Sequence, residues 1–101
     1  MITENEAVKK IENAIEDCMK DVVLYVCEFG YVDADDFDAV GHDYACVYLL
    51  IDTAKDLGIP LKYTEYETIQ NFIESLISKY AWKTEYLDKI KSGEIKLPWE
   101  Q

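Results

Sequence analysis

Apolar positions near the start of the chain predict one long amphipathic helix. They are Val8, Ile11, Ile15, Cys18, Val22, Tyr25 and Phe29. Their spacing alternates between three and four residues, which places them in one stripe along a helix. Thr3 and Glu6 form a capping box before this stripe, and Gly30 follows it at the place of a left-handed C-terminal cap. We therefore predict a helix over residues 4–29, about 39 Å long at 1.5 Å per residue.

The last third of the chain repeats this arrangement. A second capping box, from Thr64 to Glu67, precedes another set of apolar residues with helical spacing. The set is Ile69, Phe72, Ile73, Leu76, Ile77, Tyr80, Leu87 and Ile90. Gly93 ends the pattern, so we predict a second long helix over residues 65–92. We expect the tail that follows to fold back onto the domain through Leu97 and Trp99.

A shorter helix is predicted between these two, over residues 43–57. Gly58 and Pro60 end it, because glycine favours a left-handed cap and proline cannot continue a helix. Tyr44–Ile51 is apolar at every position, which is typical of a helix that others enclose. Residues 33–40 are expected to add a short turn of helix, with Asp33 as its N-cap.

These segments favour an all-α fold, a small helical bundle in one domain of residues 1–101. The alternative is an α+β fold with strands near 21–28 and 44–51, since both stretches are short, apolar and rich in β-branched and aromatic residues. We favour the bundle because the helical spacing continues without a break from Val8 to Phe29. A chain of 101 residues has the size of one ordinary domain.

Charge is the strongest functional signal in the sequence. The formal charge is −11, and the chain has no arginine. Residues 1–54 hold 13 acids against three lysines, a net of −10, whereas residues 55–101 hold eight acids against seven lysines, a net of −1. Such a surface repels nucleic acid and anionic membranes and attracts basic partners. We therefore expect no direct binding to nucleic acid or membrane.

The residues that could carry chemistry do not complete a site. His42 and Cys46 are four apart on one helix face, but a zinc site needs three or four ligands and a thiol nucleophile needs further partners. A calcium-binding loop that begins at Asp36 would need an acid at position 12, where Val47 stands. We expect no metal, no cofactor and no enzymatic activity.

Cysteines and apolar runs bear on the compartment. Cys18, Cys27 and Cys46 are an odd number of thiols inside apolar runs, which fits reduced cysteines of a cytosolic protein. The longest apolar runs, Val22–Cys27 and Tyr44–Ile51, are far shorter than the roughly 20 residues that a membrane helix needs. We expect a soluble cytoplasmic protein, of a cell or of a phage-infected cell.

The leading functional hypothesis is a small inhibitor that presents carboxylates to a basic, nucleic-acid-binding protein such as a nuclease. Phage anti-defence proteins, anti-CRISPRs among them, and immunity proteins against toxic nucleases are acidic domains of this general kind. Spaced carboxylates can take the places of backbone phosphates, and aromatic residues can anchor the contact. The predicted partner-binding residues are Glu28, Tyr31, Asp33, Asp35, Asp36, Phe37, Asp38 and Asp43.

A second aromatic face is predicted at Trp82 and Tyr86, four residues apart in the last helix. It is either an exposed anchor for a partner or a patch that the tail covers through Leu97 and Trp99. The alternative function is a helical oligomerisation or adaptor module, in which acidity confers solubility alone. A homodimer stays open, because the stripe of the first helix also fits a coiled coil.

Overall fold

The computed structural model describes residues 3–32, 34–63 and 66–101, and within these ranges every regular element is a helix. The elements are α1 (Glu4–Phe29), α2 (Ala34–Asp56), α3 (Tyr66–Tyr80), η1 (Thr84–Tyr86), α4 (Leu87–Ser92) and η2 (Pro98–Glu100). The all-α prediction is confirmed. The alternative strands near 21–28 and 44–51 are wrong, because both stretches lie inside long helices.

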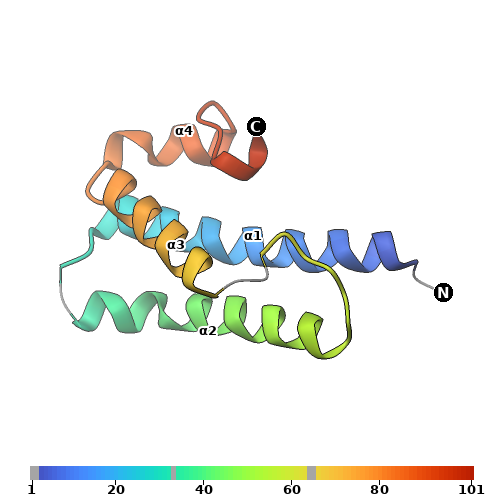
Figure 1. The fold of residues 1–101 in the computed structure, drawn as a ribbon. Coiled ribbons are helices and arrows are strands. Elements are labelled where there is room, and N and C mark those ends of the chain that lie inside the picture. The colour runs from blue at the N-terminus through green and yellow to red at the C-terminus, as the bar shows by residue number, and fades with distance from the viewer. Residues whose placement is uncertain (1–2, 33, 64–65) are drawn as a thin grey trace.

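Helix α1 is the centre of the bundle. Helix α2 runs antiparallel along one side of it, while α3 crosses it obliquely and α4 lies beyond (Figure 1). The side chains of α1 that the bundle buries are Ile15, Met19, Val22, Val23, Val26 and Cys27. These residues cover more than one face of α1, because helices pack on it from two sides. Phe29, predicted to end the buried stripe, is instead 55% exposed.

Both ends of α1 follow from local chemistry. Thr3 accepts a hydrogen bond at its side-chain oxygen from the backbone N–H of Glu6, at 3.2 Å, as the capping box predicts. Gly30 has the positive φ expected of a C-terminal cap, at 77°, but its ψ of −172° is extended. The chain therefore leaves α1 sharply instead of through a left-handed turn. The second predicted capping box, at Thr64, lies outside the described residues.

Helix α2 is longer and less enclosed than the sequence suggests. The predicted turn and the predicted helix after it are joined in one continuous helix, Ala34–Asp56, which passes through Gly41, and the predicted N-cap Asp33 lies outside the described residues. Its buried side chains, Val40, Val47, Ile51 and Ala54, all face one side. That side packs on α1, and the opposite side meets solvent, with Leu49 66% exposed. The prediction of an enclosed helix is therefore wrong.

The predicted helix over 65–92 is broken after α3. Trp82 has a φ of 67°, in the left-handed region that residues other than glycine rarely adopt. The chain turns at this residue before η1 and α4 begin. A tertiary hydrogen bond fixes this turn, since the Trp82 N–H donates to the backbone carbonyl of Val26 at 3.0 Å. The Cys27 thiol donates to the Lys83 carbonyl at 2.6 Å. Both bonds tie the turn to the end of α1.

The turn allows the last part of the chain to fold back, as predicted for the tail. Ile90 of α4 and Leu97 are fully buried in the core. The Trp99 ring meets Phe72 of α3 edge-on, with ring centroids 6.2 Å apart. Among the helices of the described ranges, none has the length and apolar character that crossing a membrane requires.

Candidate functional site

Most of the predicted partner-binding residues meet at one end of the bundle. At the left of Figure 1, the end of α1 lies between the start of α2 and the turn after α3 and is hydrogen-bonded to both. We call this region the acidic end and define it by residues 28–32, 35–38 and 82–85. It contains Glu28, Tyr31, Asp35, Asp36, Phe37 and Asp38. Asp33 lies outside the described residues, and Asp43 lies further along α2.

Asp36 holds this end together. Its carboxylate accepts the Tyr25 hydroxyl at 3.1 Å and the Val32 backbone N–H at 2.7 Å. The first bond joins α2 to α1, and the second fixes the loop between them. A hydrogen bond to a charged group stabilises the folded state by about 1.5–3 kcal/mol, and the Asp36 carboxylate accepts two such bonds. Asp36 is therefore mainly a structural residue, whereas Asp35 and Asp38 beside it point outward and are exposed.

Aromatic rings extend from Phe37 along α2. Phe37 lies 6.0 Å from Tyr44, and Tyr44 lies 6.5 Å from Tyr48, between ring centroids. Burial raises the pKa of Tyr44 to about 12, and Tyr31, Glu74 and Tyr48 add to the shift. Burial also raises the pKa of Tyr31, with Asp36 and Glu74 adding to it. These tyrosines stay neutral at physiological pH and offer hydroxyls and ring edges beside the carboxylates.

Trp82 covers the end of α1. A Cβ placed on Gly30 would overlap Cδ2, Cε2 and Cζ2 of the indole, so one face of the ring lies directly on the Gly30 backbone. The side chain is nevertheless 60% exposed, so the other face meets solvent. The left-handed backbone conformation of Trp82 destabilises the folded state by about 1–2 kcal/mol, because the residue is not glycine.

Trp82 and Tyr86 do not share one helical face, because the helix breaks between them. Tyr86 is half-buried and packs against the core. The tail does not cover Trp82, since Leu97 is buried in the core and Trp99 packs on Phe72. Of the two predicted aromatic residues, Trp82 is the one that the fold presents to solvent.

The residues considered for catalysis or metal binding lie outside the acidic end, in the middle of α2. The Cys46 sulfur is 3.7 Å from the Nε2 atom of His42, which confirms that they share a face. Burial raises the pKa of the Asp43 carboxyl, and nearby Asp21 raises it further. Burial raises the pKa of the Cys18 thiol to about 11, with Cys46 adding to the shift. In the described part of the chain, no three His, Cys, Asp or Glu residues are placed to hold a metal ion.

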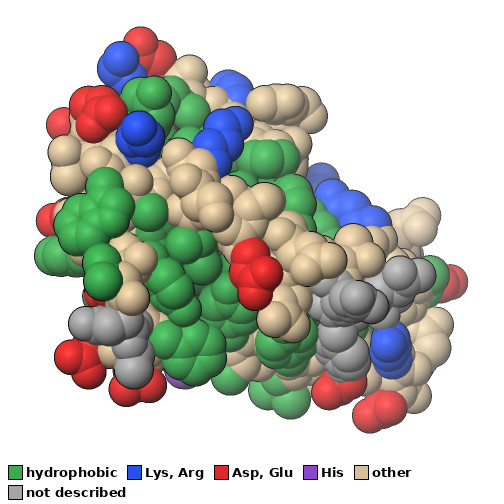
Figure 2. All heavy atoms as spheres, turned by 60° about the vertical axis from the view of Figure 1, so that its left-hand side comes forward, with side chains coloured by type: hydrophobic (Ala, Val, Ile, Leu, Met, Phe, Trp, Pro, Cys, Tyr) green, Lys and Arg blue, Asp and Glu red, His purple; other side chains and the backbone are tan. Residues whose placement is uncertain are grey.

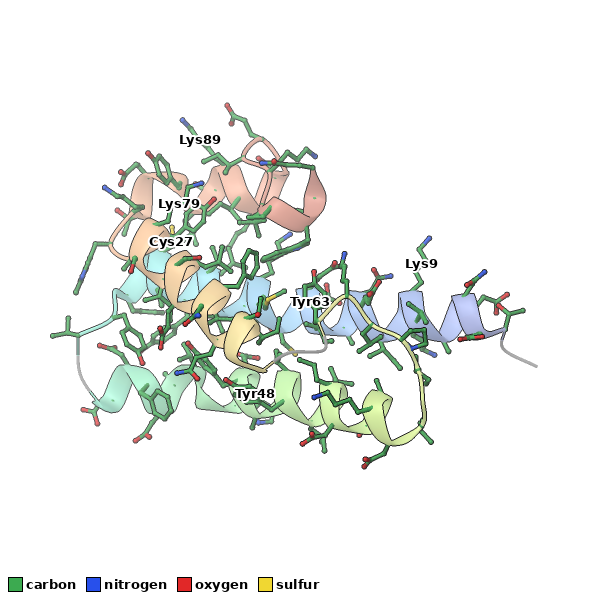
Figure 3. The ribbon with its side chains drawn as sticks, in the orientation of Figure 1. Lys9, Cys27, Tyr48, Tyr63, Lys79 and Lys89 are labelled. Carbon is green, nitrogen blue, oxygen red and sulfur yellow. The ribbon has the colours of Figure 1, made fainter. Side chains whose placement is uncertain are left out.

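Charge separates across the molecule. Helix α2 carries six acids against one lysine, whereas residues 81–101 carry four of each. Figure 2 shows acidic side chains along the lower edge, where α2 lies, and most of the lysines above, together with further acidic side chains. Lys89 points outward from α4, on the side away from α2 (Figure 3). The excess of negative charge therefore lies on α1 and α2, whose ends form most of the acidic end.

The sequence analysis did not assign two apolar residues of this end, Phe29 and Val32, to the partner-binding surface. Phe29 and Val32 are exposed at the end of α1 and just after it, and hydrophobic side chains run down the face in Figure 2. A signal was present for Phe29, which stands directly before the Gly30 stop at the end of its stripe. Exposed apolar residues gathered among carboxylates are typical of a protein interface.

Searches with this chain found no matching protein family, no matching curated protein and no matching solved structure.

Proposed function

We propose that this protein is a small acidic inhibitor that binds a basic protein through the acidic end. The observation that carries the proposal is that exposed apolar side chains and exposed carboxylates occur at the same end of the bundle. Phe29, Phe37 and Trp82 supply the apolar contact, and Asp35 and Asp38 supply exposed charge. A contact of this kind gains affinity from buried aromatic anchors and gains speed from long-range attraction.

The partner that fits this surface is a nucleic-acid-binding protein with a basic cleft, such as a nuclease. Carboxylates on successive turns of a helix can occupy positions that backbone phosphates otherwise take. The net charge of −11 favours such a cleft over other protein surfaces. An anti-defence protein of phage, of the anti-CRISPR kind, or an immunity protein against a nuclease is the specific role we propose.

The acidic end is held rigid before any partner arrives. Asp36 fixes the start of α2 to α1, and the Trp82 N–H fixes the turn after α3 to Val26. A surface that is already in its bound shape loses less conformational entropy on binding. This rigidity supports a tight inhibitor more than a flexible adaptor.

One observation favours the alternative, a helical oligomerisation or adaptor module. Leu49 and Leu57 are both exposed on the outer side of α2 or just beyond its end, away from the α1 interface. Two copies could pair there. The net negative charge of α2 opposes such pairing, because like charges on facing helices repel.

Capture from a native lysate tests the proposal. The immobilised protein should retain basic nucleic-acid-binding proteins at about 50 mM salt and release them at about 300 mM, where screening is stronger. Asp35→Asn with Asp38→Asn should abolish the capture. The matched control, Asp52→Asn with Asp56→Asn, removes equal charge from the far end of α2 and should leave it unchanged.

Equal loss in both double variants would mean that the column retains basic proteins through net charge alone, and the proposal would fail. Asp36 is left intact in these variants, because its carboxylate supports the fold. The captured protein should lose its nucleic-acid binding when the wild-type chain is added. Retention of that activity would exclude an inhibitor.

A further inference from the structure

Trp82 is the feature of the acidic end that the fold itself leaves unexplained. Its backbone is strained, its side chain is large and apolar, and it is 60% exposed. Strained residues tend to occur where function requires them. The rest of the turn is strongly fixed, by Val26 and by the Cys27 thiol. The result is an indole held flat on Gly30 with its outer face free of the core.

Two exposed acidic residues lie near the turn that carries this indole. Glu28 lies two residues before Gly30, and Glu85 lies three residues after Trp82. Both are close enough to Cys27, under the turn, to raise the pKa of its thiol, after the larger effect of burial. Cys27 is labelled at this end of the bundle in Figure 3. The turn that exposes the indole therefore has negative charges near it, contributed by α1 and η1.

Two lysines of this chain, Lys79 and Lys83, are close to Trp82 in the sequence. The Lys79 ammonium lies over the Tyr80 ring, 5.4 Å from its centroid. Lys83 follows Trp82 directly, and its backbone carbonyl accepts the Cys27 thiol. Against these two lysines stand Glu28 and Glu85, and the exposed carboxylates of Asp35 and Asp38 lie beyond them.

We propose that Trp82 is the platform for an arginine side chain of the basic partner. A planar guanidinium stacks on an indole face and is attracted by its π-electrons, while its N–H groups can donate to nearby carboxylates. Lysine has a more strongly hydrated, compact charge and fits such a platform less well. A second copy of this chain cannot fill the site, because the chain has no arginine. The inference rests on the proposed function, whose partner it specifies more closely.

Short fluorescein-labelled peptides test this directly. One peptide alternates arginine with alanine, and a second has lysine in place of every arginine. Fluorescence anisotropy should show tighter binding of the arginine peptide to the wild-type protein. Trp82→Ala should weaken it about two- to fivefold, the size of an exposed cation–π contact, and should remove the preference over lysine. Trp82→Phe should keep part of the preference.

The matched control is Trp99→Phe, which changes the other tryptophan, at the Phe72 contact. It should leave both affinities unchanged, and it leaves Trp82 as a single fluorophore whose emission should respond to the arginine peptide. Circular dichroism of Trp82→Ala and Trp82→Phe establishes that both remain helical. Equal binding of the two peptides, or an unchanged preference in Trp82→Phe and Trp82→Ala, would overturn the inference.

The same experiment separates this inference from the proposed function. If Asp35→Asn with Asp38→Asn weakens both peptides while Trp82→Ala has no effect, the arginine platform is wrong and the acidic end remains. If Trp82→Ala removes the preference while the charge variant binds normally, the platform stands and the carboxylate-driven inhibitor is wrong.

Discussion

Replacement of Gly30 by alanine is the perturbation that the structure defines most sharply. Gly30 has φ 77° and ψ −172°, a conformation that residues with a side chain almost never adopt, and the strain is of order 1–3 kcal/mol. The added Cβ would also overlap the Trp82 indole, so that ring must leave its place. Displacement of the ring would weaken the hydrogen bond from the Trp82 N–H to the Val26 carbonyl, which stabilises the folded state by about 0.5–1.5 kcal/mol. We expect Gly30→Ala to lower the free energy of unfolding by about 2–4 kcal/mol.

Two other glycines separate these contributions. Gly58 has φ 69°, and a Cβ there would meet no atom within 4 Å, so Gly58→Ala should cost the backbone strain alone, about 1–2 kcal/mol. Gly41 lies inside α2 with open space around it. Gly41→Ala should therefore stabilise the protein by about 0.5–1 kcal/mol, because alanine is the better helix former.

Urea denaturation followed by circular dichroism measures all three variants. The decisive comparison repeats Gly30→Ala in a Trp82→Ala background, where the overlap no longer exists. The cost should then fall toward that of Gly58→Ala, giving a coupling of about 1 kcal/mol between positions 30 and 82. If Gly30→Ala and Gly58→Ala lower the free energy of unfolding equally, with no coupling to position 82, the indole does not rest on Gly30.

Three further outcomes follow from single residues. Asp36→Ala should lower the free energy of unfolding by about 2–4 kcal/mol in urea denaturation, because it leaves the Tyr25 hydroxyl and the Val32 N–H without their acceptor; a loss below about 0.5 kcal/mol would show that these bonds do not hold α2 to α1. Burial, and after it the hydrogen bond to Glu16, raises the pKa of Tyr63 from 10.0 to about 12. The unfolded chain therefore loses the hydroxyl proton at a lower pH than the folded protein does. The free energy of unfolding should fall as pH rises from about 10 to about 12. Tyr63→Phe should reduce that slope in thermal melts, and an unchanged slope would contradict the assignment. Burial raises the pKa of Asp43, because it disfavours the charged carboxylate in the folded state. Asp43→Asn should therefore raise the melting temperature at pH 7 and lose this advantage at acidic pH, where the wild-type carboxyl is protonated. A lower melting temperature of the variant at pH 7 would show that the carboxylate stabilises the protein.

Helix ends were predictable where capping chemistry is local. The predicted bounds 4–29 agree with α1, since Thr3 bonds to Glu6 three residues away and Gly30 stands at the end. Gly58 also ends α2 as predicted, with hydrogen bonds from Gly58 to Lys55 and from Ile59 to Ala54. Such contacts join residues within one or two turns, so their signature is contained in a short stretch of sequence.

The turn at Trp82 could not be read in the same way. Its N–H donates to Val26, 56 residues earlier in the chain, and tryptophan is not a residue that marks a left-handed turn. The local signal was an interruption of the apolar stripe at Lys83 and Thr84, which is compatible with a continuous helix. The continuity of α2 through Gly41 has a similar cause, since burial of Val40 and Val47 against α1 outweighs the poor helix propensity of glycine.

The predicted partner-binding residues lie mostly at one end of the bundle, and one of them, Asp36, has a structural role that the sequence did not indicate. Six of the eight residues lie at that end, which the run of acids between residues 28 and 43 made visible. The sequence did not show which acid forms hydrogen bonds within the protein. A clue was present, because Asp36 precedes the buried Val40 by one helical turn and so shares its side of α2. Phe29 was assigned to the core because its spacing fits the stripe, whereas the helices packed on α1 do not reach it.

The most direct test of the central claim is the salt dependence of affinity for the captured partner. Dissociation constants would be measured for the purified pair at several salt concentrations between about 50 and about 300 mM. We expect a steep loss of affinity with salt for the wild type and for Asp52→Asn with Asp56→Asn. For Asp35→Asn with Asp38→Asn we expect weaker binding and a shallower dependence. Identical affinities and slopes for the two double variants would contradict the central claim.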